Sequence, residues 1–236
     1  MKGYVDIHSH FLYGVDDGAK TKTDMEVMLD AAHADGVTSI FFTPHVTPGV
    51  YPLKGKLIKK RLKEARMYCR SKGYEMDLFA GAEIMYTPAL ERFALEGRLP
   101  SLADTDTILL EFVPDISYKE MEAAVGMLER SGYDVIIAHV ERYACLYRRH
   151  NAYRLKEKHD VSYQMNCSSI LKGKGFLKDH RMNKWLKDEI IDYVATDSHD
   201  LKKRPPLMSA AHSLLRQKYR KAYADKLVGR RSARTR

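Results

Sequence analysis

The strongest constraint on the fold is an alternation, repeated along the chain, between short apolar runs and longer amphipathic stretches. Seven runs rich in β-branched residues have the length of buried strands: Tyr4–Ile7, Ser39–Thr43, Asp77–Ala82, Thr107–Glu111, Asp134–Ala138, Val161–Asn166 and Ile190–Thr196. The stretches that follow them have helical apolar spacing: Thr23–Asp35, Leu53–Ser71, Pro88–Leu95, Tyr118–Ser131, Arg148–Lys158, Phe176–Asp188 and Ser209–Leu227. Uninterrupted strand–helix units predict a parallel sheet, and we expect an α/β barrel of seven strands. The alternative is a doubly wound open sheet.

A single domain accounts for almost the whole chain. Its 236 residues contain no repeat, low-complexity segment or Pro/Gly/Ser-rich linker, and their number suits one barrel. We expect residues 1–228 to form the barrel and residues 229–236 to form a basic, flexible tail. The formal net charge of +9 fits a nucleic acid, an acidic lipid or a phosphorylated protein as partner, and equally a solvated surface with none.

Cysteine usage indicates the compartment. Cys69, Cys145 and Cys167 are odd in number, far apart and without C-x-x-C spacing, so no disulfide framework is expected. No apolar run could span a bilayer, and the N-terminus lacks the pattern of a signal peptide. We therefore expect a cytoplasmic protein.

The residues that follow the predicted strands carry the functional signal. Parallel strands of a barrel end on one face, which is where such folds place their chemistry. Six of the seven predicted strands end in side chains that can bind a metal: His8, His10, Asp17, His45, Glu83, Glu111, His139, Asp197 and His199. A lone histidine or strand-end carboxylate is more often structural, but His8 and His10 point the same way in an extended segment. Charges placed directly after apolar runs also need compensation, which a cation cluster supplies.

The composition of this set indicates which metals it suits. Imidazole and carboxylate without thiolate favour Mn, Fe or Zn, and the carboxylate content favours Mn. Nine candidate ligands are too many for one ion, so two or three ions with bridging groups are expected.

Several segments together resemble one family. DIHSHFLYGVDDGAKT, TPH, HVERY and TDSHDLKKRPP are similar to the PHP (polymerase and histidinol phosphatase) superfamily, and more narrowly to bacterial manganese-dependent tyrosine phosphatases of capsule and exopolysaccharide synthesis. The resemblance covers all but the basic tail. It departs in detail, since Val140 stands where proline is expected, but no ligand position is lost.

The resemblance implies a distorted (β/α)7 TIM-like barrel of the PHP type with a trinuclear metal site. It assigns His8, His10, Glu83 and Asp197 to one ion. Glu83 bridges to a second ion, which Glu111 and His139 also hold. Asp17, His45 and His199 hold the third, whereas Asp16 is expected to be a turn residue beside Gly18.

The chemistry expected of such a site is hydrolysis of a phosphotyrosine monoester by a metal-activated hydroxide. Arg142, three residues after His139, and Arg204, five after His199, are expected as catalytic and substrate-binding groups that clamp the phosphate. Tyr51, in PGVYP, is expected at the substrate pocket. A thiol mechanism is excluded, because the Cys-x5-Arg loop it needs is absent.

The leading interpretation is a protein tyrosine phosphatase acting on a tyrosine autokinase of polysaccharide synthesis, with nucleic acid not expected as partner. One alternative is a PHP phosphoesterase acting on histidinol phosphate or on nucleotide or nucleic-acid ends. The other is a non-catalytic phosphotyrosine-binding protein. The remaining histidines are expected at the surface: His33, His150, His159, His180 and His212.

Overall fold

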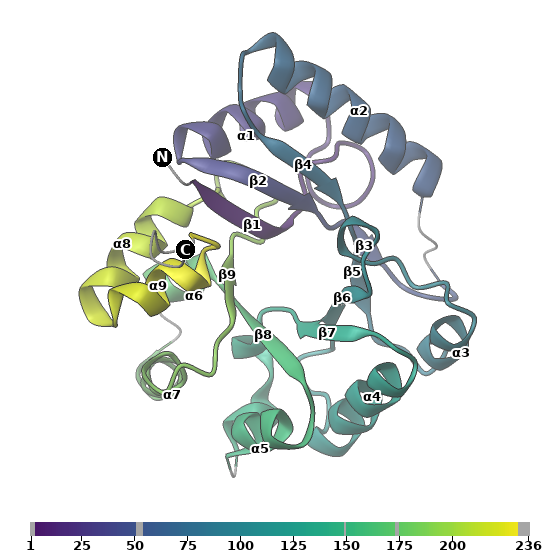
Figure 1. The fold of residues 1–236 in the computed structure, drawn as a ribbon, viewed down its shortest axis with the longest axis vertical. Coiled ribbons are helices and arrows are strands. Elements are labelled where there is room, and N and C mark those ends of the chain that lie inside the picture. The colour runs from purple at the N-terminus through teal and green to yellow at the C-terminus, as the bar shows by residue number, and fades with distance from the viewer. Residues whose placement is uncertain (1–2, 51–53, 149, 173–174, 231–236) are drawn as a thin grey trace, which may run out of the picture.

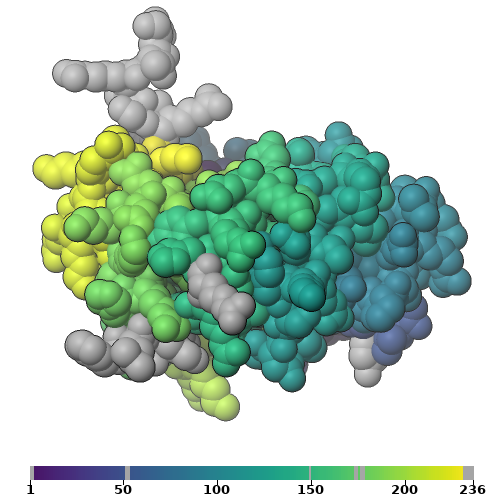
Figure 2. All heavy atoms as spheres, turned by 90° about the horizontal axis from the view of Figure 1, so that it is seen from below, coloured from purple at the N-terminus to yellow at the C-terminus, as the bar shows by residue number. Residues whose placement is uncertain are grey.

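The strands form a ring with the helices on its outside (Figure 1). The computed structural model describes residues 3–50, 54–148, 150–172 and 175–230. Because the strands close into a ring, the expected α/β barrel is confirmed and the alternative of a doubly wound open sheet is wrong. Seen from below, the surface passes from blue and teal segments on the right, through green ones, to the yellow C-terminal segments on the left (Figure 2).

All strand pairs in the described residues are parallel. The strands are β1 (Tyr4–Ser9), β2 (Val37–Phe42), β3 (His45–Val46), β4 (Asp77–Ala80), β5 (Glu83–Met85), β6 (Thr107–Glu111), β7 (Asp134–Ile137), β8 (Val161–Asn166) and β9 (Tyr193–Ala195). They form two sheets, in the orders β1-β2-β4 and β3-β5-β6-β7-β8-β9. Two of the predicted strands match these bounds at both ends, namely Thr107–Glu111 and Val161–Asn166.

The barrel is distorted because its second and third strands are each interrupted. Pro44, which has no N–H to donate to a ladder, separates β2 from β3. Gly81 separates β4 from β5, where a Cβ would lie 2.6 Å from Leu102 Cδ2. Each of these strands therefore begins in one sheet and continues in the other.

The ring closes between β9 and β1. Ser9 forms a parallel bridge with Ser198, the Asp197 N–H donates to the His8 carbonyl at 2.9 Å, and the His10 N–H donates to the Ser198 carbonyl at 2.9 Å. A small apolar cluster includes Ile7 of β1 and Leu109 of β6. Because β1 and β6 lie on different sides of the ring (Figure 1), this cluster fills the barrel interior, while a larger core lies between strands and helices.

The helices are α1 (Lys22–Ala34), α2 (Gly55–Ser71), α3 (Leu90–Leu95), α4 (Tyr118–Arg130), α5 (Asn151–Lys158), α6 (Cys167–Lys172), α7 (Phe176–Lys187), α8 (Met208–Lys218) and α9 (Lys221–Leu227). Short 3-10 turns lie at Leu102–Asp104 (η1), Val140–Arg142 (η2) and Ala144–Tyr147 (η3). Helix α1 starts with a capping box between Thr21 and Asp24. The predicted helix over 209–227 is two helices, and α6 is an addition to the prediction.

The C-terminal residues that the structure describes are held against the barrel. The Val5 N–H donates to the Val228 carbonyl at 3.0 Å, and the Arg230 N–H donates to the Asp225 carbonyl at 2.9 Å. The rest of the expected tail, residues 231–236, lies outside the described residues. In the described part of the chain, no helix has the length and apolarity that crossing a membrane demands.

Candidate metal centre

The nine candidate ligands converge on one face of the barrel, where β1, β2, β4, β6, β7 and β9 end; His45 and Glu83 stand at the starts of β3 and β5, just after the ends of β2 and β4. They come from β1 and the loop after it, from β3, β5 and β6, and from the segments after β7 and β9. Six are buried with at most 3% exposure: His8, His10, Glu83, His139, Asp197 and His199. Asp17, whose side chain is 58% exposed, opens the site to solvent.

Four of these residues form one tight group: His8, His10, Glu83 and Asp197. Glu83 Oε2 lies 3.1 Å from His8 Nε2 and 3.4 Å from His10 Nε2, and Asp197 Oδ1 lies 3.5 Å from both nitrogens. The resemblance assigns the same four residues to one ion.

Glu83 also belongs to a second group, with His45 and Glu111. His45 Nδ1 lies 3.1 Å from Glu83 Oε2 and 3.5 Å from Glu111 Oε2. His139 approaches from the other side, with its Nε2 2.7 Å from Glu83 Oε1 and 3.4 Å from Glu111 Oε1. Glu83 is thus the carboxylate shared between groups, although the resemblance expects His139 rather than His45 as its partner in the second.

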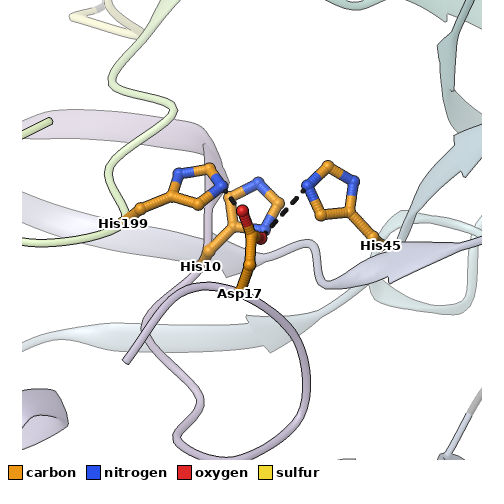
Figure 3. A group of neighbouring side chains, drawn as sticks. All are labelled: His10, Asp17, His45 and His199. Carbon is orange, nitrogen blue, oxygen red and sulfur yellow. Dashed lines mark ion pairs between the residues drawn. The ribbon is translucent and has the colours of Figure 1, made fainter. Parts of the chain in front are cut away.

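The third group consists of His10, Asp17, His45 and His199 (Figure 3). Asp17 Oδ1 lies 3.4 Å from both His45 Nε2 and His199 Nε2. His10, which the resemblance assigns only to the first group, stacks on His199 with ring centroids 3.8 Å apart.

Neighbouring groups fix which imidazole nitrogen faces the centre. Asp16 Oδ2 lies 2.7 Å from His10 Nδ1 and also accepts from the backbone N–H of His45 at 3.1 Å. His199 Nδ1 donates to the Asp197 carbonyl at 2.9 Å. Asp16 does form the expected turn, since its Oδ1 accepts from the Gly18 N–H, but it additionally orients His10, as carboxylates do behind metal-bound histidines.

Two amide side chains of β8 complete this arrangement, and neither is among the residues predicted from the sequence. Gln164 Oε1 accepts from the His139 backbone N–H at 2.8 Å, which identifies this atom as the oxygen, and it lies 3.2 Å from His8 Nδ1. Gln164 Nε2 donates to Asn166 Oδ1, and Asn166 Nδ2 donates to Asp197 Oδ2, both at 2.8 Å. The signal available was the strict alternation of β8, in which Ser162, Gln164 and Asn166 share one face of the strand.

The donor chemistry fits metal ions. His8 Nδ1 donates to Gln164, and His10 Nδ1 donates to Asp16. The Nε2 atom of each neutral ring therefore carries a lone pair, and the two Nε2 atoms lie 3.2 Å apart. Glu83 Oε2 and His199 Nε2 are buried without a hydrogen-bond partner in the described residues. Convergent lone pairs of this kind are unfavourable unless a cation lies among them.

Without such a cation the side chains perturb one another strongly. Burial alone lowers the pKa of His10, but the hydrogen bond to Asp16 and the nearby Glu83 carboxylate raise it to about 10. Burial likewise opposes ionisation of Glu83, yet the surrounding imidazoles hold the pKa of its carboxyl well below the usual range. Burial and the nearby His10 lower the pKa of His199 to about 4. Perturbation of this size is typical of functional sites.

Two of the six non-glycine residues with positive φ in the described chain lie at this centre. His139 and Asp197 adopt positive φ angles of 34° and 50°, a region that non-glycine residues rarely enter. Each lies two residues after a barrel strand, His139 after β7 and Asp197 after β9, and each contributes its side chain to the site.

Both predicted arginines lie at the rim. Arg142 pairs with Asp197 and lies 3.9 Å from Glu111. Arg204 lies 3.5 Å from Asp17 and 3.8 Å from Asp197. Tyr51, the third predicted substrate contact, lies outside the described residues.

Comparison with known proteins is consistent with this centre. The family model for capsular polysaccharide synthesis, CpsB/CapC, matches residues 4–235. The tyrosine-protein phosphatase CpsB of Streptococcus pneumoniae is 30% identical over 223 residues, covering 91% of this chain and 90% of the relative. The tyrosine-protein phosphatase YwqE of Bacillus subtilis is 29% identical over 201 residues, covering 85% and 79%. A crystal structure from a study of YwqE and CpsB, described as unique metal-dependent tyrosine phosphatases, superposes with a TM-score of 0.82 at 27% identity, covering 97% of this chain and 95% of that one.

Proposed function

The chain belongs to the CpsB/CapC family of capsular polysaccharide synthesis, and on this premise we propose that it is a metal-dependent phosphatase that hydrolyses phosphotyrosine in proteins. The observation that carries the proposal is the convergence of nine ligand-type side chains around the shared carboxylate of Glu83. The relatives named tyrosine-protein phosphatases supply the substrate class.

The residues proposed to hold the metal are His8, His10, Asp17, His45, Glu83, Glu111, His139, Asp197 and His199. We propose two or three ions, with Mn²⁺ preferred because the set combines imidazole and carboxylate without thiolate. Once bound, such ions supply Lewis-acid stabilisation of phosphoryl oxygens and a water-derived nucleophile near neutral pH. Glu83, whose Oε2 lies 3.1 Å from both His8 and His45 and whose Oε1 lies 2.7 Å from His139, is proposed to serve more than one ion.

The two arginines are proposed to bind the phosphate. The side chains of Arg142 and Arg204 are 35% and 39% exposed, so each guanidinium combines a carboxylate contact with N–H groups open to a ligand. A guanidinium fork matches the oxygens of a phosphate monoester, which carries nearly two charges at neutral pH. The ion pairs with Asp197 and Asp17 hold the forks at the rim before substrate arrives.

The protein partner is proposed to be a tyrosine kinase of polysaccharide synthesis, since capsular polysaccharide synthesis is the context of the family. We propose a cytoplasmic location, because all three cysteines are free and two are buried. Residues 1–228 are proposed as the phosphatase barrel, with a basic tail after it.

A substrate panel tests the proposal. Hydrolysis of p-nitrophenyl phosphate, a phosphotyrosine peptide, histidinol phosphate and a short oligonucleotide is measured with Mn²⁺ and with a chelator. We expect chelator-sensitive activity that is highest on the phosphotyrosine peptide and is lost in His139→Ala.

Two controls make the panel decisive. Arg142→Lys keeps the charge but loses the planar fork, so we expect a raised KM for the phosphotyrosine peptide. Activity that resists the chelator would refute the metal mechanism, and a preference for histidinol phosphate or the oligonucleotide would reassign the substrate.

A further inference from the structure

A pocket of about 470 Å³ adjoins the candidate metal centre. One end of it is formed by Asp17 and His199, both shown in Figure 3. The pocket then extends away from the centre between α1 and the loop after His199. A ligand whose phosphate lies among the candidate ligands can therefore extend into this pocket.

The walls of the pocket include exposed apolar side chains. Val27 of α1 and Leu201 of the facing loop are 43% and 41% exposed, while Met28 beside them is buried. Val27 and Leu201 are two of only six large hydrophobic residues exposed in the described chain. Apolar surface beside a polar site is typical of a binding subsite.

The rim of the pocket carries lysines that no carboxylate neutralises at close range. Lys20, Lys202 and Lys203 are exposed, and in the described residues no carboxylate oxygen lies within 4.0 Å of their ammonium groups. The Lys20 ammonium group donates to the Asp17 carbonyl at 2.8 Å. Of the carboxylates that line the pocket, Asp17 faces the metal centre and Arg204, whereas Asp24 and Asp200 accept from backbone N–H groups. Asp24 accepts from the Lys20 and Thr21 N–H groups.

The loop that bears two of these lysines has a fixed shape. Asp200 Oδ1 accepts from the N–H groups of Lys202 and Lys203, both at 2.6 Å. The Ser198 hydroxyl and the His199 N–H donate to the Arg204 carbonyl at 2.7 and 3.1 Å. The loop is thus closed on itself before any ligand binds, which reduces the entropic cost of docking.

On the basis of the proposed phosphatase function, we propose that this pocket binds the residues next to phosphotyrosine in the protein substrate, with an apolar side chain between Val27 and Leu201 and a carboxylate beside Lys202 and Lys203. The pocket is continuous with the candidate metal centre, and its ammonium groups complement an acidic segment. The pocket then selects among phosphotyrosine sites, while the metal centre and arginines act on the phosphate.

Matched phosphotyrosine peptides test this inference. One carries leucine, aspartate and glutamate on one side of the phosphotyrosine, a second carries them on the other side, and a third has serine, asparagine and glutamine in their place. The readout is kcat/KM for each peptide divided by kcat/KM for p-nitrophenyl phosphate. We expect one acidic, apolar peptide to exceed the neutral one by about tenfold, and high salt to reduce the preference.

Variants locate the preference in the pocket. Lys202→Ala/Lys203→Ala and, separately, Leu201→Ser are each expected to lower the ratio for the preferred peptide by about fivefold, mainly through KM. The matched control is Lys221→Ala/Lys226→Ala on α9, which removes the same charge from a helix that does not line the pocket. The residue after this helix, Val228, accepts from the Val5 N–H at the start of β1. Equal ratios for all peptides, or equal losses in both lysine pairs, would overturn the inference.

Failure of the proposed function gives a different result. If no phosphotyrosine peptide is hydrolysed while another phosphoester is, the phosphatase proposal fails and the docking inference fails with it. If all phosphotyrosine peptides are hydrolysed with the same kcat/KM, only the docking inference fails.

Discussion

Gln164 offers the sharpest test of how the metal centre is organised. Its Oε1 atom accepts from two buried donors, the His139 N–H at 2.8 Å and His8 Nδ1 at 3.2 Å. Gln164→Leu leaves the His139 N–H without an acceptor, whereas the His8 proton moves to Nε2, which lies 3.1 Å from Glu83 Oε2. Since an unsatisfied buried donor costs about 1–3 kcal/mol, the free energy of unfolding of the metal-free protein should fall by about that amount.

The same substitution should weaken metal binding. His8 loses the partner that keeps its proton on Nδ1 and its Nε2 lone pair toward the centre. Loss of such an orienting contact lowers metal affinity by about 10–100-fold. Urea unfolding of the chelated protein gives the stability, and Mn²⁺ titration by calorimetry gives the affinity.

Met165→Ala provides the matched control. Met165 is the next residue of β8, is fully buried and belongs to the larger core rather than the centre. Its truncation should cost a similar stability, about 2–5 kcal/mol, and leave Mn²⁺ affinity unchanged. Gln164→Leu with wild-type Mn²⁺ affinity, or Met165→Ala with an equal loss of affinity, would refute the orienting role of Gln164.

Other expectations follow from the same geometry. Chelation should lower the thermal midpoint reversibly, because an ion present at about 100 times its Kd stabilises the fold by about 2.7 kcal/mol; scanning fluorimetry with and without added Mn²⁺ measures this, and an unchanged midpoint would contradict it. Asp16→Ala removes the carboxylate behind His10 and should weaken Mn²⁺ binding about 10–100-fold by calorimetry, whereas retained affinity would reduce Asp16 to a turn residue. Gly18→Ala would put a Cβ 2.0 Å from the His10 carbonyl oxygen, so we expect a loss of about 1–3 kcal/mol in urea unfolding; a neutral effect would mean that the turn yields.

Much of the barrel could be predicted from sequence because each unit shows its own local pattern. Thr107–Glu111 and Val161–Asn166 are recognisable as buried runs of strand length, and they match the structure at both ends. The break at Gly81 could not be predicted, because its cause is the approach of Leu102 from another segment. The boundary between α8 and α9 was missed as well, because no glycine or proline marks it.

The histidines show the same limit. His212 was expected at the surface, and this prediction is wrong: it is buried, with its Nε2 2.7 Å from Asp225 and its Nδ1 3.2 Å from the Tyr4 hydroxyl. Tyr4 is 208 residues away in sequence. A histidine within a charged helical stretch carries no local sign of such partners.

The candidate ligands and the groups that orient them differ in how far sequence can identify them, and the reason is physical. Histidine or carboxylate after an apolar strand can be recognised alone, because a parallel barrel brings every strand end to one face. An orienting residue is defined only by its partner: Gln164 acts on His8, 156 residues earlier. Asn166 likewise acts on Asp197, 31 residues later. Both amides lie on β8, the one predicted strand without a candidate ligand, and they connect His8, His139 and Asp197. Their role could not be predicted, because it depends on partners that only the folded barrel brings beside them.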